Sequence, residues 1–191
     1  MTDVLEAMRK RRMHRYFDPA PLDDETLRTF AWAATRAPAG GNQPSRYVLV
    51  VKNPLLVKTL IEVTPSYIGT PPPAVIVILT DEDSAEEQMG TQGRDHLSRL
   101  DAGAAAENIA LAAVGLGLGC YLFRCSNEAA LRVVFDLPRS VRVDWLAAVG
   151  HPATPPSFAP KAPRHVVFVD RWGGDQWEVR PWQVSLQRVV Q

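Results

Sequence analysis

The stretch AGAAAENIALAAVGLGLGCYLF, residues 102–123, is the most apolar run of this 191-residue chain and constrains its fold most strongly. Glu107 and Asn108 interrupt the run, and its apolar residues are mainly Ala and Gly rather than Leu. A buried helix explains this composition better than a membrane span, which needs about 20 continuous apolar residues. We therefore expect a long helix at the centre of a folded domain.

That helix should cover residues 97–116, and the glycines of GLGLG (115–119) should end it. CYLF (120–123) is then a strand or an extended segment. GLGLG follows a helix instead of joining a strand to a helix, so it does not meet the structural context of a dinucleotide-binding turn.

Outward from this centre, helical and strand patterns are mixed without strict alternation, which favours an α+β fold. A polar, glycine-broken and partly helical excursion is expected over 81–96. The expected helices are a short one after Asp3 that includes Arg9 to Arg12 in its last turn, one over 22–37, one over 54–63 and one after Asn127. The expected strands are 46–52, 74–80, 141–150 and 165–172.

No internal linker divides the chain, so we expect a single domain, 1–191, with residues 151–191 as an extended C-terminal arm. The arm begins with the proline-rich stretch 151–164 and ends in a tail that contains Trp172, Trp177 and Trp182. A tail so rich in aromatic residues would suit contact with another surface, and packing on its own subunit is the alternative.

The overall charge argues against a nucleic-acid-binding domain, which remains a distant third alternative, because Lys+Arg and Asp+Glu are both 21. The N-terminal MTDVLEAM lacks the basic and apolar regions of an export signal, so we expect a cytoplasmic protein that does not enter membranes.

Cys120 and Cys125 are too few for a disulfide framework. They favour buried thiols, with a redox or metal role as the alternative, and we assign no metal site.

The sequence RKRRMHRYF, residues 9–17, concentrates basic side chains in an otherwise neutral chain. Nucleic acid, a membrane surface, a buried phosphate and a solvated helix end are the four candidate explanations. A helix C-terminus favours cations, which accounts for Arg9 to Arg12. It does not account for Arg15, which lies beyond the expected helix.

Five segments, in order along the chain, resemble the FMN-dependent nitroreductase family. RRMHRYF resembles the family's R-R-S-x-R-x-F opening, and RAPAGGNQPSRYVLVV (36–51) resembles its A-P-S-x-G-N-x-Q-P-W loop and strand. The other three are AAENIALAAVGLGLGCYLF, LRVVFDLPRSVRVDWLAAVGHP and KAPRHVVFVDRW. The resemblance implies a central mixed, mostly antiparallel sheet flanked by helices. It also implies a homodimer in which a C-terminal extension wraps the partner and FMN lies at the interface.

The resemblance also assigns the basic cluster to the FMN phosphate. Arg11, Arg12 and Arg15 match the first basic group of the family, and Lys161 or Arg164, or both, match the second. Guanidinium groups suit this role because they bind phosphate through paired hydrogen bonds. Arg15 is an equally good candidate for the pyrimidine side of the flavin, where positive charge stabilises the anionic reduced form.

Two further segments are expected to line the flavin. By resemblance, Pro38, Ala39, Gly40 and Asn42 contact the ring and ribityl chain, and backbone groups of Leu122 and Phe123 lie near N5. Met13 stands where the family usually has Ser, so only its backbone is expected to contact FMN. The NQPSR sequence is one residue shorter than the family's N-x-Q-P-W and lacks the Trp.

The family resemblance implies an NADH- or NADPH-dependent oxidoreductase that reduces a small organic acceptor, such as a nitroaromatic or a quinone, in a ping-pong reaction. Hydride passes through flavin N5, so no catalytic side chain is expected. Two alternatives stay open. One is a flavin-binding or storage protein without efficient turnover, and the other is a specialised member, either a dehalogenase or a flavin-consuming enzyme.

Overall fold

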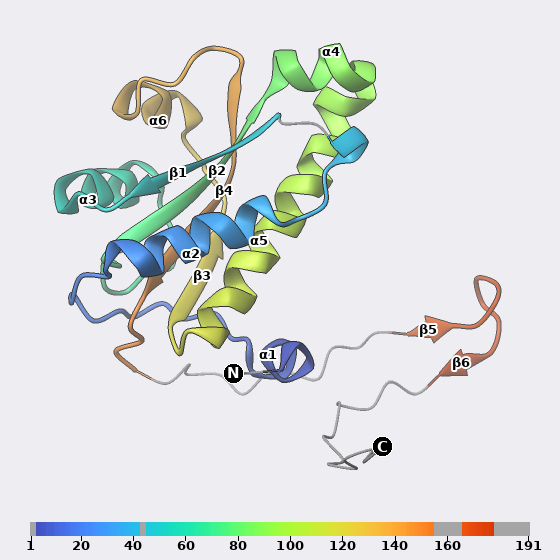
Figure 1. Ribbon diagram of the computed structural model, residues 1–191, viewed down its shortest axis with the longest axis horizontal. Helices are drawn as coiled ribbons and strands as arrows, with labels where there is room; N and C mark the ends of the chain where they lie inside the picture. The colour runs from blue at the N-terminus through green and yellow to red at the C-terminus, as the bar shows by residue number, and fades with distance from the viewer. Residues whose placement is uncertain (1–2, 43–44, 155–165, 178–191) are drawn as a thin grey trace.

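A four-stranded antiparallel sheet forms the centre of the molecule (Figure 1). The computed structural model describes residues 3–42, 45–154 and 166–177. The strands are β1 (Arg46–Val51), β2 (Ala74–Asp81), β3 (Gly119–Phe123) and β4 (Val141–Gly150), in the order β1-β2-β4-β3. The parallel contact among the described residues is a bridge between Met13 and Cys120. The expected α+β fold with a mostly antiparallel sheet is confirmed.

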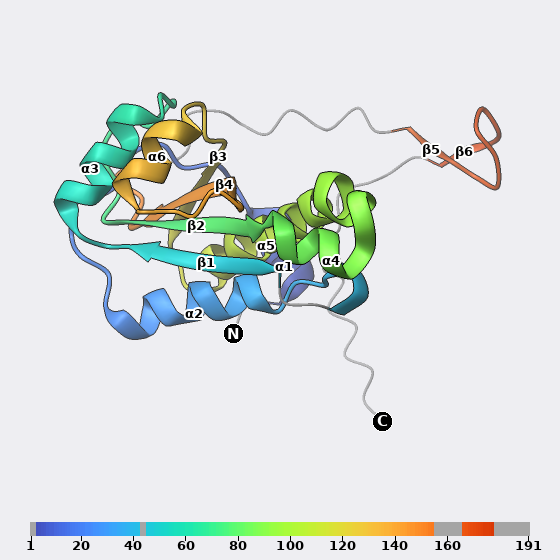
Figure 2. The same cartoon turned by 90° about the horizontal axis from the view of Figure 1, so that it is seen from above.

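Helices cover both faces of the sheet, so its central strands are buried on both sides (Figure 2). On one face lie α2 (Asp24–Thr35) and α5 (Ser98–Gly115), and on the other lie α3 (Pro54–Val63) and α6 (Glu128–Val134). Successive strand residues point to opposite faces. This double burial explains why β2 begins with the unbroken apolar run AVIVIL (74–79) rather than an alternating pattern.

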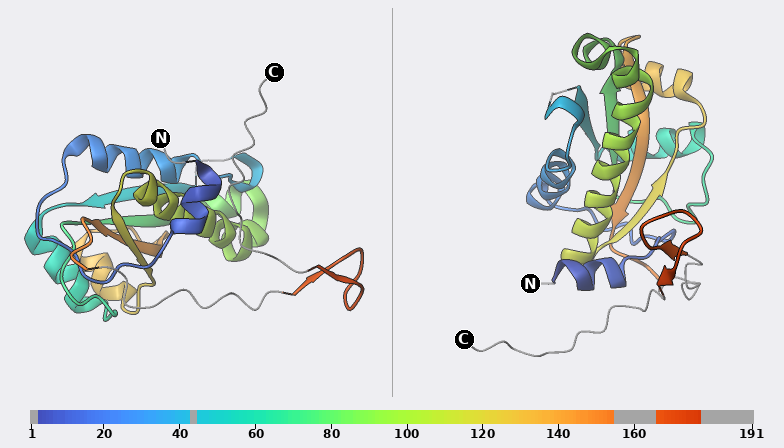
Figure 3. Two further views of the ribbon diagram at one scale, coloured as in Figure 1. Left: turned by 90° about the horizontal axis from the view of Figure 1, so that it is seen from below. Right: turned by 90° about the vertical axis from the view of Figure 1, so that its right-hand side faces the viewer.

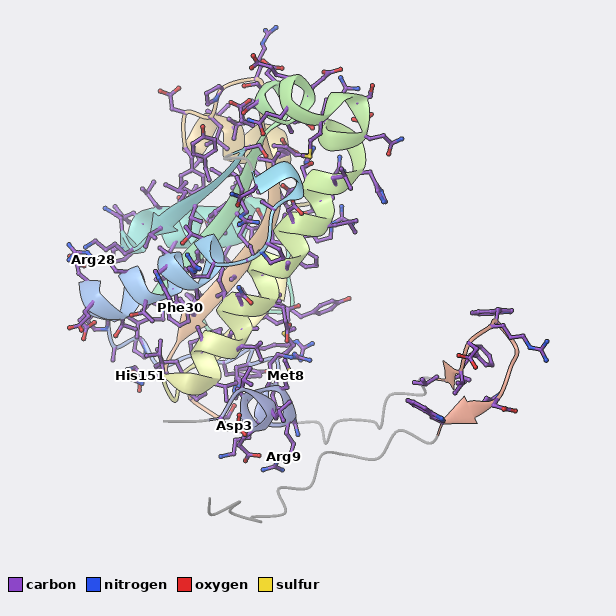
Figure 4. All side chains as sticks on the ribbon, turned by 45° about the vertical axis from the view of Figure 1, so that its right-hand side comes forward. Asp3, Met8, Arg9, Arg28, Phe30 and His151 are labelled. Carbon is purple, nitrogen blue, oxygen red and sulfur yellow. The ribbon has the colours of Figure 1, made fainter. Side chains whose placement is uncertain are left out.

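The two faces of β2 belong to two separate apolar clusters. Ile76 and Ile78 pack with α2 and α5, where Phe30 points inward and the exposed Arg28 points away (Figure 4). Val75 and Val77 pack with α3 and α6 on the other face. The sheet therefore fixes the relative positions of all four helices.

Helix α5 contacts the sheet through small side chains, as the composition of 102–123 predicts. Its buried residues are Ser98, Ala102, Ala105, Ala106, Ile109, Ala110 and Ala113. Small side chains let a helix backbone lie close to the surface it covers. Gly117, with a φ of 70°, lies just beyond the helix end. The expected central helix, its glycine stop and the strand after it are all confirmed.

The polar excursion expected over 81–96 is helical almost throughout. It forms α4 (Glu82–Gln92) and a π-helical turn, η2 (Gly93–Leu97), which continues directly into α5. Gly90 adopts φ 65° and ψ −166°, a conformation outside the helical region. The glycine therefore forms a kink between two helical pieces of α4, which the composition alone did not reveal.

The N-terminal helix is shorter than expected. Helix α1 (Val4–Lys10) is capped by Asp3, as predicted, but it ends before Arg11 and Arg12. The expected position of those two arginines in its last turn is therefore wrong. The Arg12 guanidinium donates to the carbonyl of Arg9 at 2.8 Å and satisfies one acceptor at the helix end. From Met13 the chain runs extended against β3.

The C-terminal described segment is a small hairpin of β5 (Val167–Phe168) and β6 (Gln176–Trp177). It is drawn apart from the sheet and helices in Figure 1 and in the left view of Figure 3. The strand expected over 165–172 is thus only two residues long, and Asp170 follows it with a φ of 62°.

Candidate flavin site

The basic segment after α1 lies along the edge of the sheet, beside β3. The His14 N–H donates to the Cys120 carbonyl at 2.9 Å, and Met13 forms a parallel bridge with the same residue. A Cβ atom at Gly119 would lie 2.9 Å from the His14 Cβ. The absence of a side chain at Gly119 therefore permits this close approach. The last glycine of GLGLG thus has a role beyond ending the helix.

The three predicted phosphate ligands from this segment have different surroundings. The Arg11 Nε lies 3.1 Å from Glu107 Oε1 of α5. Arg12 donates to backbone carbonyls at the end of α1. The Arg15 guanidinium lies over the Tyr121 ring, 5.0 Å from its centroid, in a cation–π contact. Among the described residues, neither Arg12 nor Arg15 forms an ion pair with a carboxylate.

The backbone of Leu122 lies on the open edge of β3. In an antiparallel pair, the N–H and C=O of one residue point to the same side, and alternate residues point to opposite sides. Because the Cys120 carbonyl faces His14, the Leu122 N–H must also face away from β4. It meets no backbone acceptor among the described residues. The Phe123 backbone faces β4 instead, and its side chain is buried.

The segment 65–70, which lies between α3 and β2, holds the basic segment from its other side. The Gly69 N–H donates to the Arg15 carbonyl at 2.7 Å. The Thr70 hydroxyl donates to the Phe17 carbonyl at 2.9 Å and accepts from the Phe17 N–H. Gly69 also lies directly against the Tyr16 ring. No sequence signal identifies these partners, because they lie more than 50 residues away along the chain.

The second predicted group lies in a tight turn, Gly40–Asn42 (η1), beside the start of α5. Gly41 and Asn42 have positive φ values of 62° and 54°. Such values favour Gly and Asn, which explains the sequence of this turn. The Asn42 N–H donates to the Ala39 carbonyl at 2.9 Å, and Asn42 is exposed. Its amide is therefore presented to the surface.

The two predicted groups are not brought together within one chain. The turn lies beside Asp101, whereas Arg11 contacts Glu107 on the same helix. Six residues of helix separate these partners by about 9 Å along the axis and by about 120° around it. Figure 1 shows η1 and α1 toward opposite ends of α5. Lys161 and Arg164 lie outside the described residues.

The environment of the basic segment also sets two pKa values. Burial lowers the pKa of His14, and its buried Nδ1 has no hydrogen-bond partner among the described residues. Burial raises the pKa of the Cys120 thiol to about 12, so this thiol is protonated and is not a nucleophile at neutral pH. Cys120 is buried, as expected for a structural thiol.

The donors along this edge fit a flavin nucleotide. Arg11, Arg12 and Arg15 supply cationic donors suited to a phosphate, and the Leu122 N–H supplies a neutral donor on the strand edge.

In the described ranges, no group of three His, Cys, Asp or Glu side chains could hold a metal ion. None of the described helices combines the length and apolarity that crossing a membrane requires.

Solved structures of known proteins share this fold. One is a proposed NADH dehydrogenase/NAD(P)H nitroreductase from Parabacteroides distasonis. It matches with a TM-score of 0.75 and 21% identity, over 88% of this chain and 98% of that one. Another is an FMN-dependent nitroreductase from Clostridium difficile. It matches with a TM-score of 0.73 and 19% identity, over 87% of this chain and 98% of that one.

The sequence itself matches the model of the nitroreductase family over residues 8–64 and 65–151, so the chain belongs to this family. A relative from Archaeoglobus fulgidus, described as a proposed NADH dehydrogenase/NAD(P)H nitroreductase, is 27% identical over 83% of this chain and 90% of its own length. The chain is thus a nitroreductase-like oxidoreductase from a family of flavin-dependent proteins.

Proposed function

We propose that this protein is an FMN-dependent oxidoreductase that uses NADH or NADPH to reduce a small organic acceptor, such as a nitroaromatic or a quinone. The observation that carries the proposal is the row of donors from Arg11 to Arg15 beside the open backbone of Leu122. Relatives and a structural neighbour named as NAD(P)H nitroreductases or as FMN-dependent support the choice of cofactors.

The chain's own residues would bind and orient the cofactor. Arg11 and Arg12 would hold the phosphate, with Lys161 or Arg164. The Tyr121 ring fixes the Arg15 guanidinium, which suits it either to the phosphate or to negative charge on the flavin. The Leu122 N–H would donate to the ring edge. Bound FMN would supply the two-electron chemistry, so the nicotinamide and the acceptor would use one cleft in turn.

A second copy of the chain would complete the site. Pro38, Ala39, Gly40 and Asn42 lie on a different face of α5 from the arginines, so they would contact the flavin held by a partner. Members of the family are generally dimeric. A dimer with FMN at the subunit interface therefore reconciles the two predicted groups with their separation in one chain.

The outer side of α5 offers a surface for this contact. Five α5 residues spaced alternately four and three positions apart, as in helix–helix contacts, form a stripe along this side. All five are half-buried or exposed. They are Leu100, Ala104, Glu107, Leu111 and Val114. Gly103, beside the stripe, has open space where a Cβ would lie. A partner helix could thus approach closely.

The C-terminal arm, 151–191, would add to the dimer contact. In its described hairpin, Trp172 is 91% exposed and Trp177 is 67% exposed. Phe168 packs against Trp172 within the hairpin, with ring centroids 5.0 Å apart. A hairpin with such exposed aromatic rings gains free energy by packing on another surface, and a partner subunit would provide one.

The proposal is tested by removing the charges at the phosphate site. We expect the double variant Arg11→Ala/Arg15→Ala to lose FMN but to remain folded, because both side chains are partly exposed. Bound flavin is measured by absorbance and folding by circular dichroism. The double variant Arg9→Ala/Lys10→Ala, whose side chains pair with Glu6 at the end of α1, removes the same charge and should keep its FMN.

A second measurement separates enzymatic turnover from simple binding. Oxidation of NADH or NADPH should depend on a quinone or nitroaromatic, with the parallel double-reciprocal plots of a ping-pong reaction. FMN binding without such oxidation would leave a flavin-binding protein. Loss of FMN from both double variants alike would show that the site depends on net charge and not on Arg11 and Arg15.

A further inference from the structure

Two side chains outside the predicted site hold the turn at residues 37–42. The Gly40 N–H donates to Asp101 Oδ2 at 2.7 Å. Arg46 donates to the Ala37 carbonyl at 3.0 Å and to the Pro38 carbonyl at 3.3 Å. Three backbone groups of one short turn are therefore fixed by Asp101 of α5 and Arg46 of β1.

These two side chains are also connected to each other. Arg46 donates to the Asp101 backbone carbonyl at 3.1 Å. Burial lowers the pKa of Arg46, and the Asp101 carboxylate opposes that shift. The contacts therefore link three parts of the chain: the first turn of α5, the first residue of β1 and the turn at residues 37–42.

We propose that Asp101 and Arg46 are positioning residues of the flavin site, which hold the turn so that Asn42 is presented in a fixed orientation. This inference rests on the proposed function. Arg46 belongs to the NQPSR sequence, the shortened segment that lacks the family's Trp. Both residues would act through the turn, by their contacts with its backbone. A turn ordered in advance strengthens binding because the ordering cost is not paid on association.

Met89 of α4 also lies against this turn, at Gly40. A Cβ atom at Gly40 would lie 2.9 Å from the Met89 Sδ and 3.6 Å from Asp101 Oδ2. These two side chains therefore fill the space that a Cβ at residue 40 would need. The turn has little room to move while both contacts are present.

The test measures FMN affinity and the order of the turn separately. Flavin-free protein is titrated with FMN and followed by the quenching of flavin fluorescence. Asp101→Ala should bind FMN about tenfold more weakly or worse, because it removes a hydrogen bond to a charged acceptor. Asp101→Asn, whose amide oxygen can still accept from Gly40, should recover part of the loss.

Amide hydrogen exchange in the flavin-free protein gives the second readout. Asp101→Ala should speed exchange at Gly40 but leave exchange in the strands unchanged. The matched control is Asn108→Ala, which also removes a hydrogen bond between an α5 side chain and the backbone, here the bond that the Asn108 amide donates to the Ala33 carbonyl at 3.1 Å. This control should keep wild-type FMN affinity.

The outcomes distinguish the inference from the proposed function. If wild-type protein binds FMN and Asp101→Ala binds it equally well, the positioning role is wrong but the proposed function stands. Equal losses in Asp101→Ala and Asn108→Ala would show a general effect on stability and would also overturn the inference. If wild-type protein takes up no FMN, both proposals fail.

Discussion

Single residues in this chain have properties that depend on partners far away in sequence. The basic segment shows this most clearly. Its composition identifies it as an anion site, but Arg11, Arg12 and Arg15 have three different environments that depend on Glu107, the end of α1 and Tyr121. Sequence can predict which residue types bind a phosphate. It cannot predict which of them a neighbouring carboxylate or ring will orient.

His14 should make the stability of the flavin-free protein depend on pH. Burial lowers its pKa in the folded state, whereas the unfolded chain takes up a proton near the ordinary value of 6.5. The unfolded state therefore binds more protons as pH falls through that value, and stability is lost toward acid. Between about pH 7.5 and pH 5, the thermal midpoint of wild-type protein should fall further than that of His14→Gln.

The comparison isolates His14 because all other titrating groups are shared by the two proteins. Parallel curves of thermal midpoint against pH would contradict the burial of a neutral His14. The unpartnered Nδ1 gives the same direction, since a proton there would find no acceptor among the described residues.

At the scale of elements, a buried ionic network attaches the helical segment formed by α4 and η2 to the sheet. Arg142 of β4 donates to Asp144 at 2.8 Å, to Glu82 at 2.5 Å and to the Ser98 hydroxyl at 2.9 Å. Thr80 of β2 donates to the same Asp144. The network therefore connects two strands with the starts of α4 and α5.

Removing one member of this network should be costly. Arg142→Met leaves Asp144 buried without its partner, which should lower the free energy of unfolding by about 3 kcal/mol or more. Urea denaturation followed by circular dichroism measures the loss. Arg132→Met is the control, because it breaks a more exposed pair with Glu128 on α6 and should cost about 0.5 kcal/mol. Similar losses in the two variants would contradict the structural role of the network.

The elements with strong patterns could be predicted from sequence, and those with weak patterns could not. Helix α5 and strand β2 follow from apolar composition, and Asp3, Asn53 and Asn127 cap helices as expected. The helical character of α4 was only partly anticipated because contacts with Arg142, not its own apolar pattern, hold it in place. The early end of α1 depends on the pairing of Met13 with β3.

At the scale of the whole molecule, the proposed function places the flavin site between two chains. The stripe on α5 gives a direct test. Leu111→Glu places a charge in the middle of the stripe and should convert a dimer into monomers, since a buried unpaired charge opposes association. Sedimentation velocity measures the change, and FMN should be lost together with the dimer.

Val133→Glu is the matched control for this substitution. Val133 is 83% exposed on α6, which covers the opposite face of the sheet from α5. This variant should remain dimeric and keep its FMN. A Leu111→Glu protein that is still dimeric and fully loaded with FMN would place the interface elsewhere.

The most direct test of the account is the flavin content of the purified protein. The visible spectrum is recorded, the protein is heat-denatured, and the released flavin is identified and compared with the chain concentration. We predict FMN in a ratio close to one per chain, on a dimer. A colourless protein that takes up no added FMN would contradict the assignment of the arginines beside β3 to a flavin phosphate, and with it the proposed oxidoreductase function.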